Sequence, residues 1–234
     1  METLNGILLP LWGTMIGSSF VFFLKKNINK KIQSYILSLS SGIMLSSSIW
    51  SLLIPSIEQS YTIFIPILGF VIGIFLLLII NQFVSDKPIY KNKIMIVSII
   101  LHNIPEGMAV GVAFAGIING YMTLSMALLL SLGIAIQNIP EGSIISMPLY
   151  SYNKNKMKSF LVGCLSGIVE PIGALIAYLL TSKIIILLPL ILSFASGAMV
   201  YVVIVDLLPS CNNKNTIIPF TIGFLLMIIL EYLF

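Results

Sequence analysis

The sequence predicts an all-α membrane protein with eight transmembrane helices, and three observations lead to this fold class. Hydrophobic residues make up 58% of the 234 residues and charged residues only 9%, whereas a soluble domain carries roughly 25% charged residues. The apolar residues form long segments separated by short polar connections. Each segment can cross a hydrocarbon core of about 30 Å as a helix. This composition excludes a disordered protein and a soluble enzyme.

The expected spans follow one another with no room for a soluble domain, so residues 1–234 are expected to form one transmembrane domain. They cover residues 4–24, 33–57, 62–84, 94–118, 121–149, 157–181, 184–209 and 216–234. Backbone polar groups in lipid must be satisfied within the segment, which favours helices over open strands. The first span has no basic residues before it, so it is interpreted as a retained helix and not as a cleaved signal peptide.

The lysines predict the orientation. All 12 basic residues are lysines, and eleven of them fall in the connections after spans 1, 3, 5 and 7, while Lys183 falls on the other side. The positive-inside rule then places both termini outside a cell (inner) membrane that the chain crosses several times. Because the basic residues are confined to short connections, a nucleic-acid partner is not expected.

Spans 4 and 5 carry a repeated polar motif. His-Asn-Ile-Pro-Glu-Gly at 102–107 and Gln-Asn-Ile-Pro-Glu-Gly at 137–142 share five consecutive residues. Ionisable groups inside a bilayer cost roughly 2.5–3.5 kcal/mol each, so they are interpreted first as functional. Residues four apart share a helical face, which places His102 beside Glu106.

The polar residues of spans 4, 5 and 6 are expected at one depth. If spans 4 and 5 form a hairpin, Glu106 faces Gln137 and His102 faces Glu141. With a rise of 1.5 Å per residue, the whole set lies within about two turns of the middle of the membrane. The candidate metal ligands are His102, Asn103, Glu106, Gln137, Asn138, Glu141 and Glu170. Imidazole, carboxylate and amide groups together suit a divalent metal such as Zn²⁺, Fe²⁺ or Mn²⁺.

Pro105, Pro140 and Pro171 lie beside these ligands. Each removes one helical N–H and frees the carbonyl four residues earlier, and transporters place their sites at such broken helices. Gly107 and Gly142 are expected to let another backbone come close.

Other polar residues in the spans have less specific interpretations. The serines of span 2 are interpreted as small residues that permit close helix packing, with pore lining as the alternative; they are Ser40, Ser41, Ser46, Ser47, Ser48 and Ser51. Glu58 and Asp206 are interfacial charges or stations for a cation. Glu231 is interpreted as structural.

The motif at 102–107 and the segment Ser-Gly-Ile-Val-Glu-Pro-Ile-Gly at 166–173 resemble the ZIP family of zinc/iron permease-like transporters. Many members of that family have His at the position of Gln137, whereas a GufA-like prokaryotic branch has Gln, so the chain resembles that branch. The resemblance covers essentially the whole chain. It implies a 3+2+3 arrangement in which spans 1–3 and 6–8 are inverted repeats around spans 4–5, and metal uptake toward the cytoplasm.

The resemblance also implies a binuclear site. The first metal site would consist of His102, Glu106, Gln137 and Glu141. The second would consist of Asn103, Asn138, Glu141 and Glu170, with Glu106 as a bridge. Some members carry an acid where this chain has Asn138, so the second site is less anionic here. The His-rich loop of many members is absent, so no metal sensor is expected there.

The leading hypothesis is a divalent metal transporter, for zinc first and for iron, manganese or cadmium next, with no catalytic cofactor and no enzymatic activity. The sequence contains no phosphate-binding Gly-Lys loop, so ATP is not expected to drive transport directly. Its partners are the metal ions and the bilayer, and a homodimer is left open by analogy. The alternatives are a membrane-embedded metal-dependent hydrolase and a metal-sensing or structural membrane protein.

Overall fold

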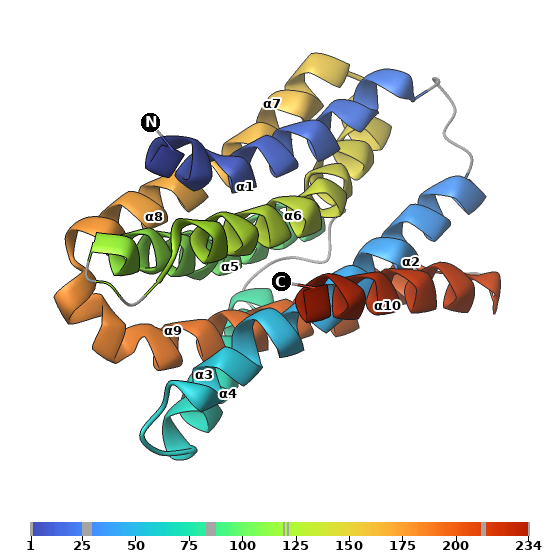
Figure 1. The fold of residues 1–234 in the computed structure, drawn as a ribbon. Helices are drawn as coiled ribbons and strands as arrows, with labels where there is room; N and C mark the ends of the chain where they lie inside the picture. Colours follow the sequence, from blue (N-terminus) through green and yellow to red (C-terminus); the bar gives the residue numbers. More distant parts are fainter. Residues whose placement is uncertain are drawn as a thin grey trace.

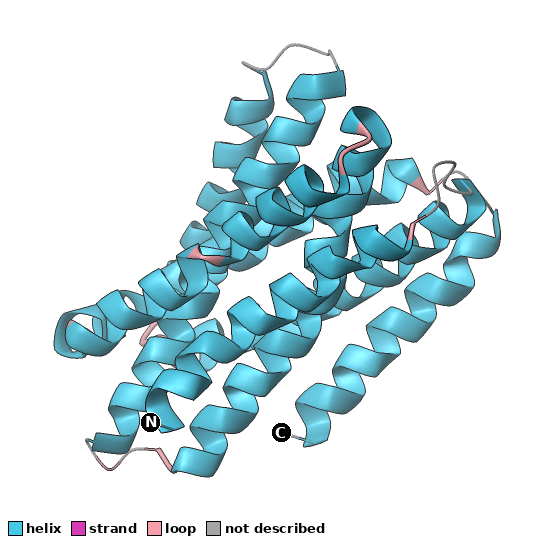
Figure 2. Ribbon diagram, turned by 90° about the horizontal axis from the view of Figure 1, so that it is seen from above, coloured by secondary structure: helices cyan, strands magenta, loops and turns pink. Residues whose placement is uncertain are grey.

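The computed structural model describes residues 2–24, 30–82, 88–118, 120, 122–211 and 214–233. This part of the chain is built from helices joined by short connections (Figure 1). The colouring by secondary structure shows helices and loops, with no strand among the described residues (Figure 2). The prediction of an all-α protein is therefore confirmed.

The helices follow the predicted order. The first half contains α1 (Glu2–Ser19), η1 (Phe20–Phe23), α2 (Lys30–Ser47), η2 (Ser48–Leu53), α3 (Ile54–Glu58), α4 (Phe64–Gln82) and α5 (Pro88–Ile118). The second half contains α6 (Leu124–Asn153), α7 (Lys156–Gly167), α8 (Val169–Leu179), α9 (Thr181–Val202), η3 (Val203–Leu207), η4 (Leu208–Ser210), η5 (Lys214–Thr216) and α10 (Ile217–Leu233).

Seven helical stretches in the described part are long and apolar enough to cross a membrane, and they match the first seven predicted spans. The predicted eighth span corresponds to α10, whose apolar stretch Ile217–Tyr232 is shorter. The count of eight therefore stays a prediction. The orientation of the chain in the membrane also stays a prediction, because Lys25, Lys26 and Lys87 lie outside the described residues.

The helices form two groups in space, one above the other in the view of Figure 1. The first group contains α1, α5, α6, α7 and α8, with α1 packed along α6 and α5 along α8. The second group contains α2, α3, α4, α9 and α10, with α4 packed along α9 and α2 along α10. The two groups meet where α5 contacts α9 and α2 contacts α6.

Glycines allow helices of the first group to approach one another closely. A Cβ atom on Gly107 would lie 2.1 Å from the backbone oxygen of Glu170, and one on Gly142 would lie 2.1 Å from the backbone oxygen of Thr14. Any larger residue at either position would push the neighbouring helix away. The prediction that Gly107 and Gly142 admit another backbone is confirmed, and it brings α5, α6, α8 and α1 into direct contact.

The prolines act differently from one span to the next. Helices α5 and α6 continue through Pro105 and Pro140, whereas the sixth span breaks at Ile168 between α7 and α8. The prediction of broken helices is thus correct for the sixth span and wrong for the fourth and fifth. Widened π-helical turns precede Pro55 and Pro209, because one extra residue in the turn relieves the clash with the proline ring.

Candidate metal centre

Buried polar side chains gather where α1, α5, α6 and α8 meet. Six of the predicted ligands are at most 2% exposed: Asn103, Glu106, Gln137, Asn138, Glu141 and Glu170. Helices α5, α6 and α8 contribute all six. These side chains therefore face protein and not lipid, as the prediction of an internal site requires.

Glu170 is the centre of one set of contacts. Asn103 Nδ2 donates a hydrogen bond to Glu170 Oε1 at 2.8 Å, and Thr14 Oγ1 donates to the same oxygen at 3.3 Å. Asn138 also lies close to this carboxylate, and its Nδ2 donates to the backbone oxygen of Pro10 at 3.3 Å. Side chains from three helices thus surround a buried carboxylate that belongs to a fourth, α8.

A second set of contacts joins spans 4 and 5. Gln137 Nε2 on α6 donates a hydrogen bond to Glu106 Oε1 on α5 at 2.9 Å. The hydroxyl group of Ser47 on α2 donates to Gln137 Oε1. The prediction that Glu106 faces Gln137 across the hairpin is confirmed.

The side chain of His102 lies outside the described residues, so its pairing with Glu141 stays a prediction. Glu141 and Glu106 both lie near enough to Glu170 for their charges to repel its charge. Among the described side chains, no three of the types His, Cys, Asp and Glu converge closely enough to hold a metal by themselves. The predicted set therefore depends on its amide groups as well as its carboxylates, and Asn103 and Gln137 each donate a hydrogen bond to one of these carboxylates.

Three oxygen atoms in this region have no hydrogen-bond partner among the described residues. They are Asn103 Oδ1, Asn138 Oδ1 and Glu170 Oε2, and all three are buried. Leaving a buried polar atom unsatisfied costs about 1–3 kcal/mol, so such atoms call for a partner. A cation is a suitable partner, because amide and carboxylate oxygens are both metal ligands.

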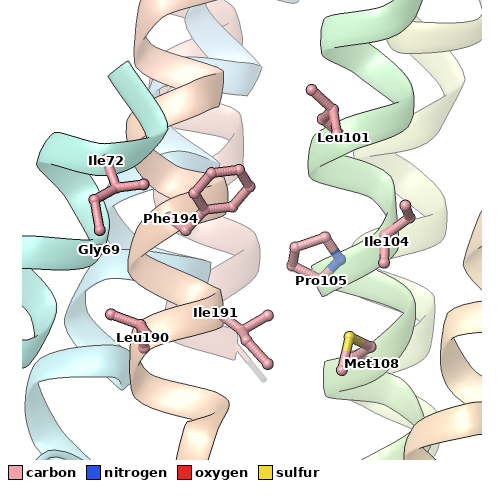
Figure 3. A pocket seen from close by; sticks show the side chains of 9 residues that line it. All are labelled: Gly69, Ile72, Leu101, Ile104, Pro105, Met108, Leu190, Ile191 and Phe194. Carbon is pink, nitrogen blue, oxygen red and sulfur yellow. The ribbon is translucent and has the colours of Figure 1, made fainter. Parts of the chain in front are cut away.

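The opposite face of α5 is apolar. A cavity of about 330 Å³ separates this face from α4 and α9 (Figure 3). Its lining residues are Gly69, Ile72, Leu101, Ile104, Pro105, Met108, Leu190, Ile191 and Phe194. The cavity lining offers no oxygen or nitrogen side-chain ligand to a metal, and its one sulfur, in the thioether of Met108, suits soft ions and not Zn²⁺ bound by carboxylates and amides.

Two residues at the centre were not among the predicted ligands. Thr14 on α1 donates a hydrogen bond to Glu170, whereas the sequence predicts only a membrane span there. The signal that could have identified Thr14 is its position between Gly13 and Gly17, which both pack closely against another helix. For Ser47 the sequence predicts close helix packing, with pore lining as the alternative. That interpretation fits Ser40 and Ser41, whose hydroxyl groups donate to carbonyls of their own helix, but Ser47 contacts a predicted ligand.

Comparison with known proteins decides the family. The family model described as "ZIP Zinc transporter" matches residues 89–231, which is more than half of the chain. The zinc transporter ZIPB of Bordetella bronchiseptica is 30% identical over 228 residues, which cover 87% of this chain and 72% of that protein. The chain belongs to the ZIP zinc transporter family.

Other relatives extend the same result. The zinc transporter ZIP11 of Xenopus tropicalis is 29% identical over an alignment that covers 99% of this chain and 96% of that protein. The zinc transporter GufA of Myxococcus xanthus is 34% identical over 142 residues, 59% of this chain and 54% of that protein. This likeness supports the GufA-like branch. ZIP family members are membrane transporters of metal ions and not enzymes, so the hydrolase alternative is not supported.

Proposed function

We propose that this ZIP family member carries Zn²⁺ across the membrane toward the cytoplasm, and that Fe²⁺, Mn²⁺ and Cd²⁺ are its next candidate substrates. The observation that carries the proposal is the group of buried oxygen atoms without hydrogen-bond partners in the described part of the centre: Asn103 Oδ1, Asn138 Oδ1 and Glu170 Oε2. They lie on three different helices, so one ion bound among them would be held from three sides.

The binuclear arrangement is part of the proposal. His102, Glu106, Gln137 and Glu141 would hold the first ion, and Asn103, Asn138, Glu141 and Glu170 the second, with Glu106 as a bridge. The two sets of contacts around Glu170 and around Glu106 support this division. Neutral amide ligands attract a cation less than carboxylates do, which favours release as well as capture.

The proposed transporter has eight spans in a 3+2+3 arrangement, with both termini outside. Span 1 packs along span 5 as span 6 packs along span 4, and span 3 packs along span 7 as span 8 packs along span 2. If spans 1–3 and 6–8 are inverted repeats, span 1 corresponds to span 6, span 2 to span 7, span 3 to span 8 and span 4 to span 5. Replacing each span by its counterpart then converts the first pairing of each couple into the second, and this agreement supports the proposal. A homodimer in the cell (inner) membrane is part of the same proposal.

Zn²⁺ flux into liposomes tests the site. Glu141→Ala is expected to lower the flux about tenfold or more, because it removes a carboxylate assigned to both ions. Glu2→Ala is the matched control, since it deletes an exposed carboxylate at the start of α1, and its flux should equal that of the wild type. Equal flux in wild type and Glu141→Ala would refute the assignment.

A titration of the purified protein with Zn²⁺ tests the number of ions. Two equivalents are expected in the wild type and one in Glu170→Ala, because Glu170 is assigned to the second ion alone. A single equivalent in both proteins would leave a mononuclear transporter. Binding should also weaken in acid, because carboxylate and imidazole ligands must lose their protons to bind the metal.

A further inference from the structure

Gln137 is held at both ends of its amide group by residues from different helices. Its Nε2 donates to Glu106 Oε1 at 2.9 Å, and its Oε1 accepts from Ser47. Ser47 is fully buried on α2, which belongs to the second helix group, whereas Gln137 and Glu106 belong to the first. The amide oxygen of Gln137 thus points to the second helix group, and its NH₂ group points to Glu106 in the first.

This orientation conflicts with metal binding by Gln137. An amide binds a cation through its oxygen, because its NH₂ group offers only donors. The described orientation turns these donors toward Glu106, and the oxygen is occupied by the Ser47 hydroxyl. Gln137 can therefore join Glu106 around an ion only if the amide turns and the contact with Ser47 breaks.

Ser47 has a second acceptor within reach. Its Oγ lies 3.2 Å from Ser51 Oγ, and the Ser51 hydroxyl donates to Glu231 Oε1. A hydroxyl group donates one proton and can accept others. Because Ser51 uses its proton on the carboxylate, it can accept the Ser47 proton once Gln137 withdraws. Breaking the contact between Ser47 and Gln137 therefore leaves no buried hydroxyl without a partner.

We propose that Ser47 is a positioning residue that holds Gln137 in its metal-free orientation, and that metal and Ser47 compete for the Gln137 oxygen. This inference rests on the proposed function, since it requires Gln137 to be a ligand. Metal binding then removes a hydrogen bond between the two helix groups. The occupied centre consequently holds the second group less firmly than the empty one does.

Zn²⁺ binding by the Ser47→Ala variant tests the competition. The dissociation constant is expected to fall about two- to tenfold, the range set by the net free energy of one hydrogen bond. Ser46→Ala is the matched control: Ser46 is the preceding residue on α2, is fully buried, and its hydroxyl has no hydrogen-bond partner among the described residues. Its dissociation constant should equal that of the wild type.

A double-mutant cycle separates positioning from a general effect on packing. In the Gln137→Ala background, Ser47→Ala should leave Zn²⁺ binding unchanged, because the group that Ser47 restrains is gone. An equal change in both backgrounds, or no change in either, would overturn the inference. If Ser47→Ala does not fold, Ser47→Cys keeps the volume with a weaker donor and should give a smaller change in the same direction; no change in this variant also overturns the inference.

The two proposals fail in different ways. A wild-type protein that binds no Zn²⁺ would contradict the proposed function. Wild-type binding with identical constants for Ser47→Ala and Ser46→Ala would contradict the role of Ser47 alone.

Discussion

At the scale of single residues, the candidate centre mixes charged and neutral oxygen donors. Glu106, Glu141 and Glu170 supply carboxylates, and the buried amides of Asn103, Gln137 and Asn138 supply oxygens without charge. Carboxylates placed this close repel one another unless a cation lies between them. Because the amides are neutral, they add oxygen donors without adding negative charge to this repulsion. The empty centre can therefore stay folded while still attracting a metal.

Gly107 lies directly against the backbone of Glu170, so its size matters to this geometry. In Gly107→Ala, the new Cβ would lie 2.1 Å from the backbone oxygen of Glu170, so α8 and its carboxylate must move. We expect a loss of about 1–3 kcal/mol in stability, the usual range for overpacking, together with weaker Zn²⁺ binding. Thermal unfolding in detergent and a Zn²⁺ titration would measure the two effects.

Gly116→Ala is the control on the same helix, because its new Cβ would lie 3.3 Å from Met122 and far less relaxation is needed. Equal losses in the two variants would argue against a special role for the contact at Gly107.

At the scale of helices, the ends of the spans are specified by local chemistry. Thr123 caps α6, since its side chain accepts a hydrogen bond from the backbone N–H of Met126 at 3.2 Å. Asn155 caps α7, since its Oδ1 accepts from the backbone N–H of Lys158 at 2.9 Å. Such caps satisfy N–H groups that the first turn of a helix leaves free.

Removing either cap should destabilise the protein. Thr123→Ala and Asn155→Ala are each expected to cost about 1 kcal/mol, measured by unfolding in detergent. Thr221→Ala should cost less, because this exposed threonine donates to a carbonyl of its own helix at 2.8 Å and caps nothing. A loss at Thr221 as large as at Thr123 would contradict the assigned caps.

The sequence predicts much of this molecule because two of its signals are local. Apolar length alone identifies the first seven spans, and equal distance from the turn predicts that Glu106 faces Gln137. Thr14 escapes prediction because its partner Glu170 is 156 residues away, and the pairing depends on how whole helices pack. The unbroken α5 also departs from the local expectation, because Pro105 removes one hydrogen bond from a helix that is otherwise continuous from Pro88 to Ile118.

At the scale of the whole molecule, the six predicted ligands whose side chains the structure describes all belong to the first helix group, in helices separated by long stretches of sequence. A metal bound to α5, α6 and α8 would act as a cross-link between them. The unfolded chain offers no such preformed site, so binding energy adds to folding stability.

Zn²⁺ should therefore raise the thermal stability of the protein. At a concentration of free metal about 100 times its dissociation constant, the gain is about 2.7 kcal/mol, and a chelator should reverse it. Glu170→Gln is expected to show a smaller rise in unfolding temperature, whereas Glu2→Gln should behave like the wild type. The same rise in Glu170→Gln and wild type would contradict a role for Glu170 in metal binding.

Magnetic-resonance spectroscopy can measure the distance between the two helix groups, because each group carries one native cysteine. Cys164 on α7 lies in the first group, Cys211 follows η4 in the second, and both are free thiols. Paramagnetic tags on these two native thiols would span the boundary between the groups without any engineered residue. Burial raises the pKa of the Cys211 thiol, so its reactive thiolate forms at higher pH than that of an exposed cysteine, and tagging there favours alkaline buffer. The distance between the tags would then show how far zinc shifts one group against the other.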